Sequence, residues 1–207
     1  MKLSFQILVF AVIFAFAGCK NRPAELTIYD LRCENLTEPA GIGTTVPGLS
    51  WKIKSGVNGT SQKACQLLAA SRPELLIEEN ADLWNSGKIS SSSANLVPYG
   101  GNTLKSRSVC YWKVRIWDEN DRMSEWSTTA AFSVGLLEKS DWNASYIGLP
   151  GKENSTVSPQ LRKTFDVKNK GEKVFLHVNS LGYHELFLNG KKVGNNVLTP
   201  AVSQFNK

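Results

Sequence analysis

Hydrophobic and polar residues alternate along much of the chain with a period of two, which is typical of β-strands. The clearest case is the segment 110–117, where Cys110, Trp112, Val114 and Ile116 fall on one face. The intervening residues fall on the other face, because successive side chains of a strand point to opposite sides. This pattern predicts a strand with one face in a hydrophobic core.

Similar runs on either side of this segment predict further strands. The other expected strands of this region cover residues 49–53, 62–70, 83–87 and 130–134, with a short helical excursion at 73–76. Turns rich in Gly, Pro, Asn and Ser separate them, which indicates an antiparallel β-sandwich from about Leu26 to Leu137. The Trp-Ser sequence before the last strand resembles the closing hairpin of a fibronectin type III domain.

A second β-domain is expected after a junction at 141–148 and a loop at 150–158. Alternation resumes at 161–165, 174–178 and 183–188. The Asn189-Gly190 turn that follows is a strong hairpin signal, because both central residues of such a turn need positive φ. The pattern supplies about three strands and one bare edge. We therefore expect an incomplete second sandwich that is loose or prone to aggregation after about Ser140.

The N-terminal residues have the pattern of an export signal. Lys2 precedes an apolar stretch that ends in Ala17-Gly18, directly before Cys19. This arrangement predicts a signal peptide. It also resembles the bacterial lipobox, in which the cysteine is acylated. An ordinary secretory signal with a nearby cysteine is the alternative. Lipidation at Cys19 would place an exported, membrane-anchored lipoprotein in the cell envelope.

These patterns define four segments. We expect a signal peptide at 1–18, a lipidated cysteine with a short tether at 19–26, a fibronectin III-like sandwich at 27–137, and the start of a second domain at 138–207. The fold class is therefore all-β: an immunoglobulin/fibronectin type III-like sandwich followed by an incomplete, jelly-roll-like sandwich.

Charge and cysteine content narrow the possible partners. The formal net charge is +6, but the basic residues are scattered and form no stripe with aromatic residues, so we expect no nucleic-acid partner. Beyond Cys19 the cysteines are Cys33, Cys65 and Cys110. One pair could be oxidised, and the sequence leaves the choice open. Their apolar neighbours favour three buried thiols. No cysteine or histidine spacing indicates a metal site, and no cofactor is expected.

Several tryptophans and carboxylates could have either a functional or a structural role, and the sequence favours the structural one. Indole rings can stack on sugars, but they also fill small sandwiches, so we assign Trp112 to the core and a covering role to Trp117 ahead of a glycan platform. Asp118 and Glu119 are adjacent in a turn and are interpreted as turn formers.

The two histidines, His177 and His184, fall on expected strands of the second domain and are interpreted as ordinary sheet residues. Glu185 follows His184 directly, so the two side chains should point to opposite faces and form no local dyad.

A family resemblance covers nearly all of the mature chain. The segments LRCENL (31–36), LSW (49–51), DLWNSGK (82–88), YWKVRIWD (111–118), SDW (140–142) and LGYHELFLNGKKVG (181–194) are similar to the N-terminal portion of bacterial α-L-rhamnosidases of the Bacteroidetes type. The resemblance implies a jelly-roll domain after the Ser-Asp-Trp segment. It also implies a six-hairpin α/α barrel that holds the catalytic acids of an inverting glycoside hydrolase.

The resemblance places those acids outside the segments that this chain matches, so no catalytic residue is assigned. We expect a non-catalytic N-terminal fragment of an enzyme that releases terminal α-L-rhamnose, with a structural or glycan-recognition role and no activity alone. Its partners would be a rhamnose-containing glycan, through the parent enzyme, and the membrane, through the lipid. The alternative is a standalone surface lipoprotein that binds glycan or protein through its sandwich. No nucleophile elbow, metal motif or spaced acid pair favours a self-contained hydrolase.

Overall fold

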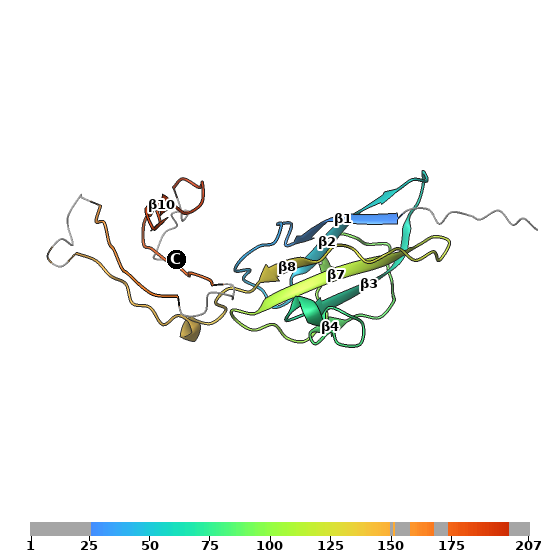
Figure 1. Ribbon diagram of the computed structural model, residues 1–207, viewed down its shortest axis with the longest axis horizontal. Coiled ribbons are helices and arrows are strands. Elements are labelled where there is room, and N and C mark those ends of the chain that lie inside the picture. Colours follow the sequence, from blue (N-terminus) through green and yellow to red (C-terminus); the bar gives the residue numbers. More distant parts are fainter. Residues whose placement is uncertain (1–25, 150, 152–157, 168–173, 199–207) are drawn as a thin grey trace, which may run out of the picture. The chain divides into compact units, whose positions relative to one another are not determined.

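The computed structural model describes residues 26–149, 151, 158–167 and 174–198 (Figure 1). The predicted signal peptide and Cys19 lie outside the described residues. The chain divides into two compact units, Met1–Trp142 and Asn143–Lys207, which are described separately.

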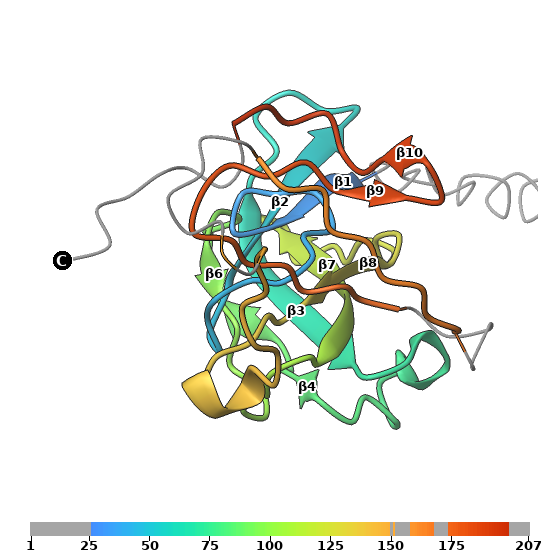
Figure 2. The same cartoon turned by 90° about the vertical axis from the view of Figure 1, so that its left-hand side faces the viewer.

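The first unit is a sandwich of two antiparallel sheets, whose layers are also visible in Figure 2. One sheet has the order β1-β2-β6, and the other has the order β4-β3-β7-β8, with β5 also paired to β3. The first sheet contains β1 (Leu26–Cys33), β2 (Gly48–Ser55) and β6 (Val97–Pro98), and the second contains β3 (Gln62–Ala70), β4 (Trp84–Asn85), β5 (Ile89–Ser90), β7 (Val109–Asp118) and β8 (Ala130–Ser133). Two 3-10 turns, η2 (Pro73–Leu75) and η3 (Lys139–Asp141), complete the unit. The all-β prediction is confirmed.

The core lies between the two sheets and follows the period of two in β7. Cys110, Trp112, Val114 and Ile116 are each at most 1% exposed, while the residues between them are half-buried. They pack with Leu49 and other residues of the opposite sheet in one hydrophobic cluster. The predicted core position of Trp112 is therefore confirmed.

Strand β2 departs from the alternation expected at 49–53. Ser50 is only 7% exposed, although the pattern predicts it on the solvent face. Its hydroxyl accepts a hydrogen bond from the Leu96 amide at 2.8 Å and donates one to the Asn95 side chain at 3.1 Å. The segment before β6 therefore covers this face and supplies the polar partners that a buried hydroxyl needs.

Strand β3 is buried on both faces, which explains its long apolar run. Leu67 lies in the main core, whereas Leu68 belongs to a second cluster on the outer face of the sheet. Leu76, just after η2, and Trp126 cover this second cluster. The short helical segment predicted at 73–76 therefore packs over a small second core on the outer face of the sheet.

The second unit contains one hairpin in its described part. Strands β9 (Phe187–Leu188) and β10 (Lys191–Lys192) pair antiparallel around Asn189 and Gly190. The φ angles of these two turn residues are 49° and 78°, as the hairpin prediction requires.

The other strands predicted for this unit are wrong as local assignments. Residues 161–165, 174–178 and 183–186 carry no strand in the structure. Phe165 is 56% exposed and Leu176 is 59% exposed. Alternation shows which side of a strand would be buried, but a strand also needs a hydrogen-bonded neighbour, and none of the described residues supplies one here.

Candidate functional site

The outer face of the β3–β7 sheet carries indole rings interleaved with cations. The Arg115 guanidinium lies 4.5 Å from the ring centroid of Trp126 and 5.3 Å from that of Trp117. Lys88 lies 4.7 Å from the Trp117 centroid, and Lys113 lies 4.9 Å from that of Trp126. Such cation–π contacts stabilise exposed sites modestly, by about 0.5–1 kcal/mol each.

Arg115 is held in place by its polar neighbours. Its Nε and Nη2 atoms donate to Gln66 Oε1 at 3.0 and 2.7 Å, and Nη2 lies 2.8 Å from Glu78 Oε1. Gln66 in turn donates to Asn85 Oδ1 at 2.9 Å. The cations of this face are therefore already bound by neighbouring side chains. Because Lys88 and Arg115 lie over the Trp117 ring, the structure favours the predicted covering role of Trp117 over a glycan platform.

The turn after β7 is built around a buried carboxylate. Asp118 is fully buried, and its Oδ1 accepts from the Asn120 and Arg122 amides at 2.9 and 2.8 Å. The Arg122 Nε donates to its Oδ2 at 2.7 Å. Burial raises the pKa of Asp118, but the hydrogen bonds outweigh burial, so the pKa falls below its usual value. The turn-forming role predicted for Asp118 is confirmed.

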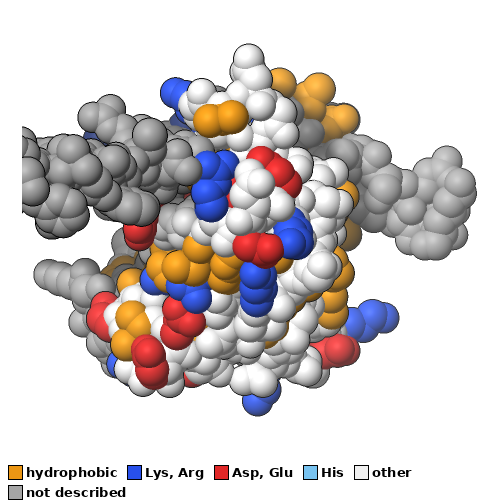
Figure 3. Space-filling view, turned by 90° about the vertical axis from the view of Figure 1, so that its right-hand side faces the viewer, with side chains coloured by type: hydrophobic (Ala, Val, Ile, Leu, Met, Phe, Trp, Pro, Cys, Tyr) orange, Lys and Arg blue, Asp and Glu red, His pale blue; other side chains and the backbone are white. Residues whose placement is uncertain are grey.

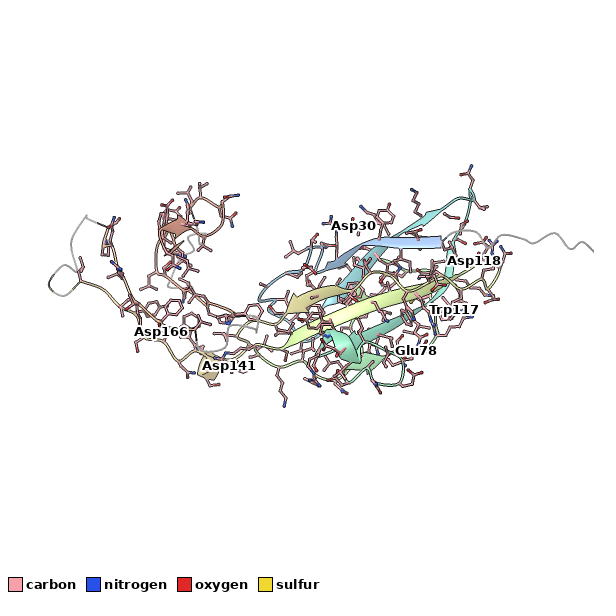
Figure 4. All side chains as sticks on the ribbon, viewed as in Figure 1. Asp30, Glu78, Trp117, Asp118, Asp141 and Asp166 are labelled. Atoms are coloured by element: carbon pink, nitrogen blue, oxygen red, sulfur yellow. The ribbon has the colours of Figure 1, made fainter. Side chains whose placement is uncertain are left out.

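Other aspartates of this unit are also held ionised. Hydrogen bonds from Lys52, Lys63 and Ser106 lower the pKa values of Asp30, Asp121 and Asp141, respectively. For Asp82, burial raises the pKa, but hydrogen bonds, chiefly two from Ser71, and the charge of Arg72 together lower it below its usual value. A general acid for glycoside hydrolysis needs a raised pKa. These carboxyl groups, labelled in part in Figure 4, are suited to structure rather than to proton donation.

A shallow polar depression of about 630 Å³ lies at the end of the sandwich where β7 ends. It is lined by Ser61, Gln62, Lys63, the run 90–93 and Glu119. Glu119 Oε2 accepts from the Ser61 amide at 2.9 Å, which joins the turn after β7 to the start of β3. Each lining side chain ends in a hydroxyl, amide, ammonium or carboxylate group.

Asp141 stabilises the segment through which the chain leaves the sandwich after β8, which we call the exit segment. Its carboxylate accepts from the Ser106 hydroxyl and, at 3.0 Å, from the Glu138 amide. Ser106 Oγ also accepts from the Leu137 amide at 2.9 Å, and Arg107 donates to the Asp141 carbonyl. The loop before β7 is therefore hydrogen-bonded to the exit segment. The Ser-Asp-Trp segment supplies Asp141, which makes most of these hydrogen bonds.

The cysteines of the first unit are buried free thiols. Cys33 is 1% exposed, and Cys65 and Cys110 are fully buried. Burial raises the pKa of Cys33 to about 12 and that of Cys65 to about 11, and it also raises the pKa of Cys110. The predicted burial of the thiols is confirmed.

Because the thiolate is the reactive form, these thiols should be inert in the folded protein. We expect a maleimide to label none of Cys33, Cys65 and Cys110 in residues 20–207 at pH 7, and all three in urea. Mass spectrometry counts the labels. Labelling of any of them at the rate of a free thiol without denaturant would contradict this burial.

In the second unit, His184 and Glu185 take different partners. His184 Nδ1 lies 2.7 Å from the Ser180 hydroxyl, and Glu185 pairs with Lys192. They form no dyad in the structure. Within the described ranges, no cluster of His, Cys, Asp and Glu has the geometry to hold a metal ion. The described residues also include no helix with the length and hydrophobicity that a membrane span requires.

Two families of known domains match the chain. Residues 28–138 match the Rha78A-like N-terminal immunoglobulin domain, and residues 169–207 match the α-L-rhamnosidase N-terminal domain. The first match spans more than half of the chain. The chain belongs to the Rha78A-like N-terminal immunoglobulin domain family. Both matches agree with the resemblance deduced from the sequence motifs.

Relatives of this Rha78A-like chain are much longer proteins. An α-L-rhamnosidase of Formosa agariphila is 34% identical over 215 residues, which cover 97% of this chain and 23% of the relative. An α-L-rhamnosidase of Alteromonas sp. is 35% identical over 220 residues, which cover 99% of this chain and 23% of that protein. The chain thus spans less than a quarter of the length of these relatives.

Solved structures support the same assignment. The α-L-rhamnosidase of Streptomyces avermitilis, crystallised with L-rhamnose, superposes with a TM-score of 0.58 at 37% identity, over 60% of this chain and 12% of that chain. The α-L-rhamnosidase of Dictyoglumus thermophilum gives 0.55 at 34% identity, over 57% and 13%. The similarity therefore extends to the three-dimensional fold of the Rha78A-like domain.

The motifs that indicated the family have structural roles in this domain. Glu34 accepts from the Gly48 amide at 2.6 Å, and Asp82 binds Ser71. Asp118 and Asp141 fix the turn after β7 and the exit of the sandwich. Sequence reasoning did not predict these partners. The only signal in the sequence was that each of these carboxylates lies at or beside the end of a strand or turn.

Proposed function

We propose that this chain is the non-catalytic N-terminal part of an α-L-rhamnosidase, with a structural or glycan-recognition role. In this proposal the hydrolysis of terminal α-L-rhamnosides belongs to the rest of the parent enzyme. The observation that carries it is the state of the carboxyl groups. Among the described residues, every carboxyl group with a shifted pKa is shifted downward and is bound by amides, hydroxyls or cations.

An inverting glycosidase needs two carboxyl groups on opposite sides of the scissile bond. One must remain protonated near neutral pH to donate to the leaving oxygen, which requires a raised pKa. The aspartates of this sandwich have the opposite property, because each is used to hold a turn, a strand end or the exit segment. This property of the aspartates supports a structural or glycan-recognition role rather than a catalytic one.

The test is an assay of residues 20–207 with a chromogenic α-L-rhamnoside, beside the full-length Alteromonas relative as a positive control. We expect no release of rhamnose above the buffer rate from this chain. Release that scales with the concentration of the chain and survives repurification would contradict the proposal.

We also propose that Cys19 carries a lipid and that the sandwich serves as a spacer in the cell envelope. Strand β1 begins at one end of the sandwich, and Asp141, the last residue of η3, lies at the other end (Figure 1, Figure 4). The ten residues of β7 span about 33 Å between the two ends. The sandwich is thus long enough to act as a spacer between the lipidated cysteine and the residues that follow Asp141 in the chain.

Metabolic labelling with a tagged fatty acid in the native host tests the anchor. We expect label on the wild-type chain and none on Cys19→Ser. Equal labelling of both proteins, or an unlabelled wild-type chain, would instead leave an ordinary secretory signal as the explanation of residues 1–18.

A further inference from the structure

The polar depression lies at the end of the sandwich opposite the exit. Asp118, which directly precedes the lining residue Glu119, is labelled at this end in Figure 4, far from Asp141. Figure 3 views the molecule from this side and shows charged groups of both signs around a hydrophobic strip. This end is therefore remote from the hydrogen bonds of Asp141 that hold the exit segment.

The serine-rich wall of the depression is fixed from the core. Gln62 is only 6% exposed, and its Nε2 donates to the carbonyls of Ser91 and Ser93 at 2.9 and 2.8 Å. Its Oε1 accepts from the indole Nε1 of the buried Trp51 at 3.0 Å. The Ser91 amide donates to the Lys63 carbonyl at 3.0 Å. The backbone of residues 90–93 is thus held in one conformation before any ligand binds.

Hydroxyl groups on this wall are available to a ligand. The side chains of Ser61, Ser90 and Ser92 make no hydrogen bond with any other described residue, and each hydroxyl can both donate and accept. Lys63 and Glu119 are oriented by Asp121, at 2.5 Å, and by the Ser61 amide, at 2.9 Å. One cation and one anion among the lining side chains leave the site without net charge.

We propose that this depression, lined by Ser61, Lys63, the run 90–93 and Glu119, is a saccharide-binding site. Free hydroxyls and a balanced charge pair match a neutral, hydroxyl-rich ligand better than an anion. The depression of about 630 Å³ has room for a sugar ring, but it is shallow, so much of the bound ring would stay in contact with solvent. A wall held by a buried glutamine avoids the cost of ordering a loop on binding.

The choice of a saccharide rests on the proposed function, and it assigns the glycan-recognition role to this site. Trp117 is not part of the site, because its ring is covered by Lys88 and Arg115. The open shape predicts weak binding, with a Kd of about 1 mM or above. Such affinity suits retention on a glycan that presents many copies of the same sugar.

The experiment is an NMR titration of 15N-labelled residues 20–207 with L-rhamnose and with a rhamnosyl-glucose disaccharide. Inorganic phosphate serves as the anionic comparison. We expect saturable amide shifts confined to residues 61–63, 90–93 and 119 with at least one of the two sugars. The double variant Ser90→Ala/Ser92→Ala should weaken binding about thirtyfold, since each of the two lost hydrogen bonds contributes about 1 kcal/mol.

Thr128→Ala/Thr129→Ala is the matched control, because it removes two exposed hydroxyls outside the depression and should leave the shifts unchanged. No saturable shift with either sugar, shifts elsewhere only, or a response to phosphate alone would overturn the saccharide site. Equal binding by the Ser90→Ala/Ser92→Ala variant and the wild type would overturn the role of the hydroxyls. Failure here would leave the non-catalytic role intact, because that role is judged by rhamnoside hydrolysis.

Discussion

Trp112→Ala should reduce the free energy of unfolding of the first unit by about 3–5 kcal/mol. Trp112 is 1% exposed at the centre of β7, where its ring packs in the core shared by both sheets. Truncation removes the buried indole and leaves a cavity that rigid neighbouring strands cannot fill. Domains of this size are stable by about 5–15 kcal/mol, so this loss is a large part of the total free energy of unfolding.

Urea unfolding of residues 20–207, followed by circular dichroism, measures this loss. Tyr29→Ala is the matched aromatic control, because Tyr29 is 46% exposed on β1 and should cost about 0.5 kcal/mol or less. A loss below about 1 kcal/mol for Trp112→Ala, comparable to that of the control, would contradict the assignment of this indole to the core.

Asp118→Ala should destabilise the same unit by about 3 kcal/mol at neutral pH, because it leaves two amides and the Arg122 guanidinium without their buried acceptor. The effect should depend on pH. The pKa of Asp118 is lower in the folded state, so the carboxylate stabilises the fold above the ordinary pKa of about 3.9 and loses this contribution as the pH falls through the folded value.

The stability difference between wild type and Asp118→Ala should therefore be largest at pH 7 and shrink steadily in acid. Urea unfolding at a series of pH values gives this profile. Glu125→Ala, at an exposed position in the same hairpin, should show little change at any pH. A difference that stays constant down to the acid limit would show that the carboxylate charge does not fix the turn.

The sequence correctly predicted those elements whose local pattern of apolar and polar residues agrees with their burial in the folded structure. The alternation around Trp112 has one buried face, as β7 does, and Asn189-Gly190 dictates positive φ by itself. Both predictions rest on interactions between residues close in sequence. The fold class followed from them and from the spacing of turns.

The remaining features depend on contacts between distant segments. Ser50 is buried because residues 95 and 96 cover it, and Gln62 is buried because it joins Trp51 to the serine-rich wall. Neither partner is indicated by periodicity. The same applies to the segments 161–165 and 174–178, whose alternation is genuine but has no paired neighbour in the described chain.

Residues 26–142 should form a self-contained, fully packed module whose structure does not depend on residues 143–207. Hydrogen exchange followed by mass spectrometry, on residues 20–207 and on residues 20–142, tests this independence most directly. We predict slow exchange in β2, β3 and β7, equal in the two chains, and fast exchange through the described part of 143–198, where many apolar side chains are exposed. Equal protection across both units, or loss of protection in β3 and β7 when residues 143–207 are removed, would contradict the independence of the module.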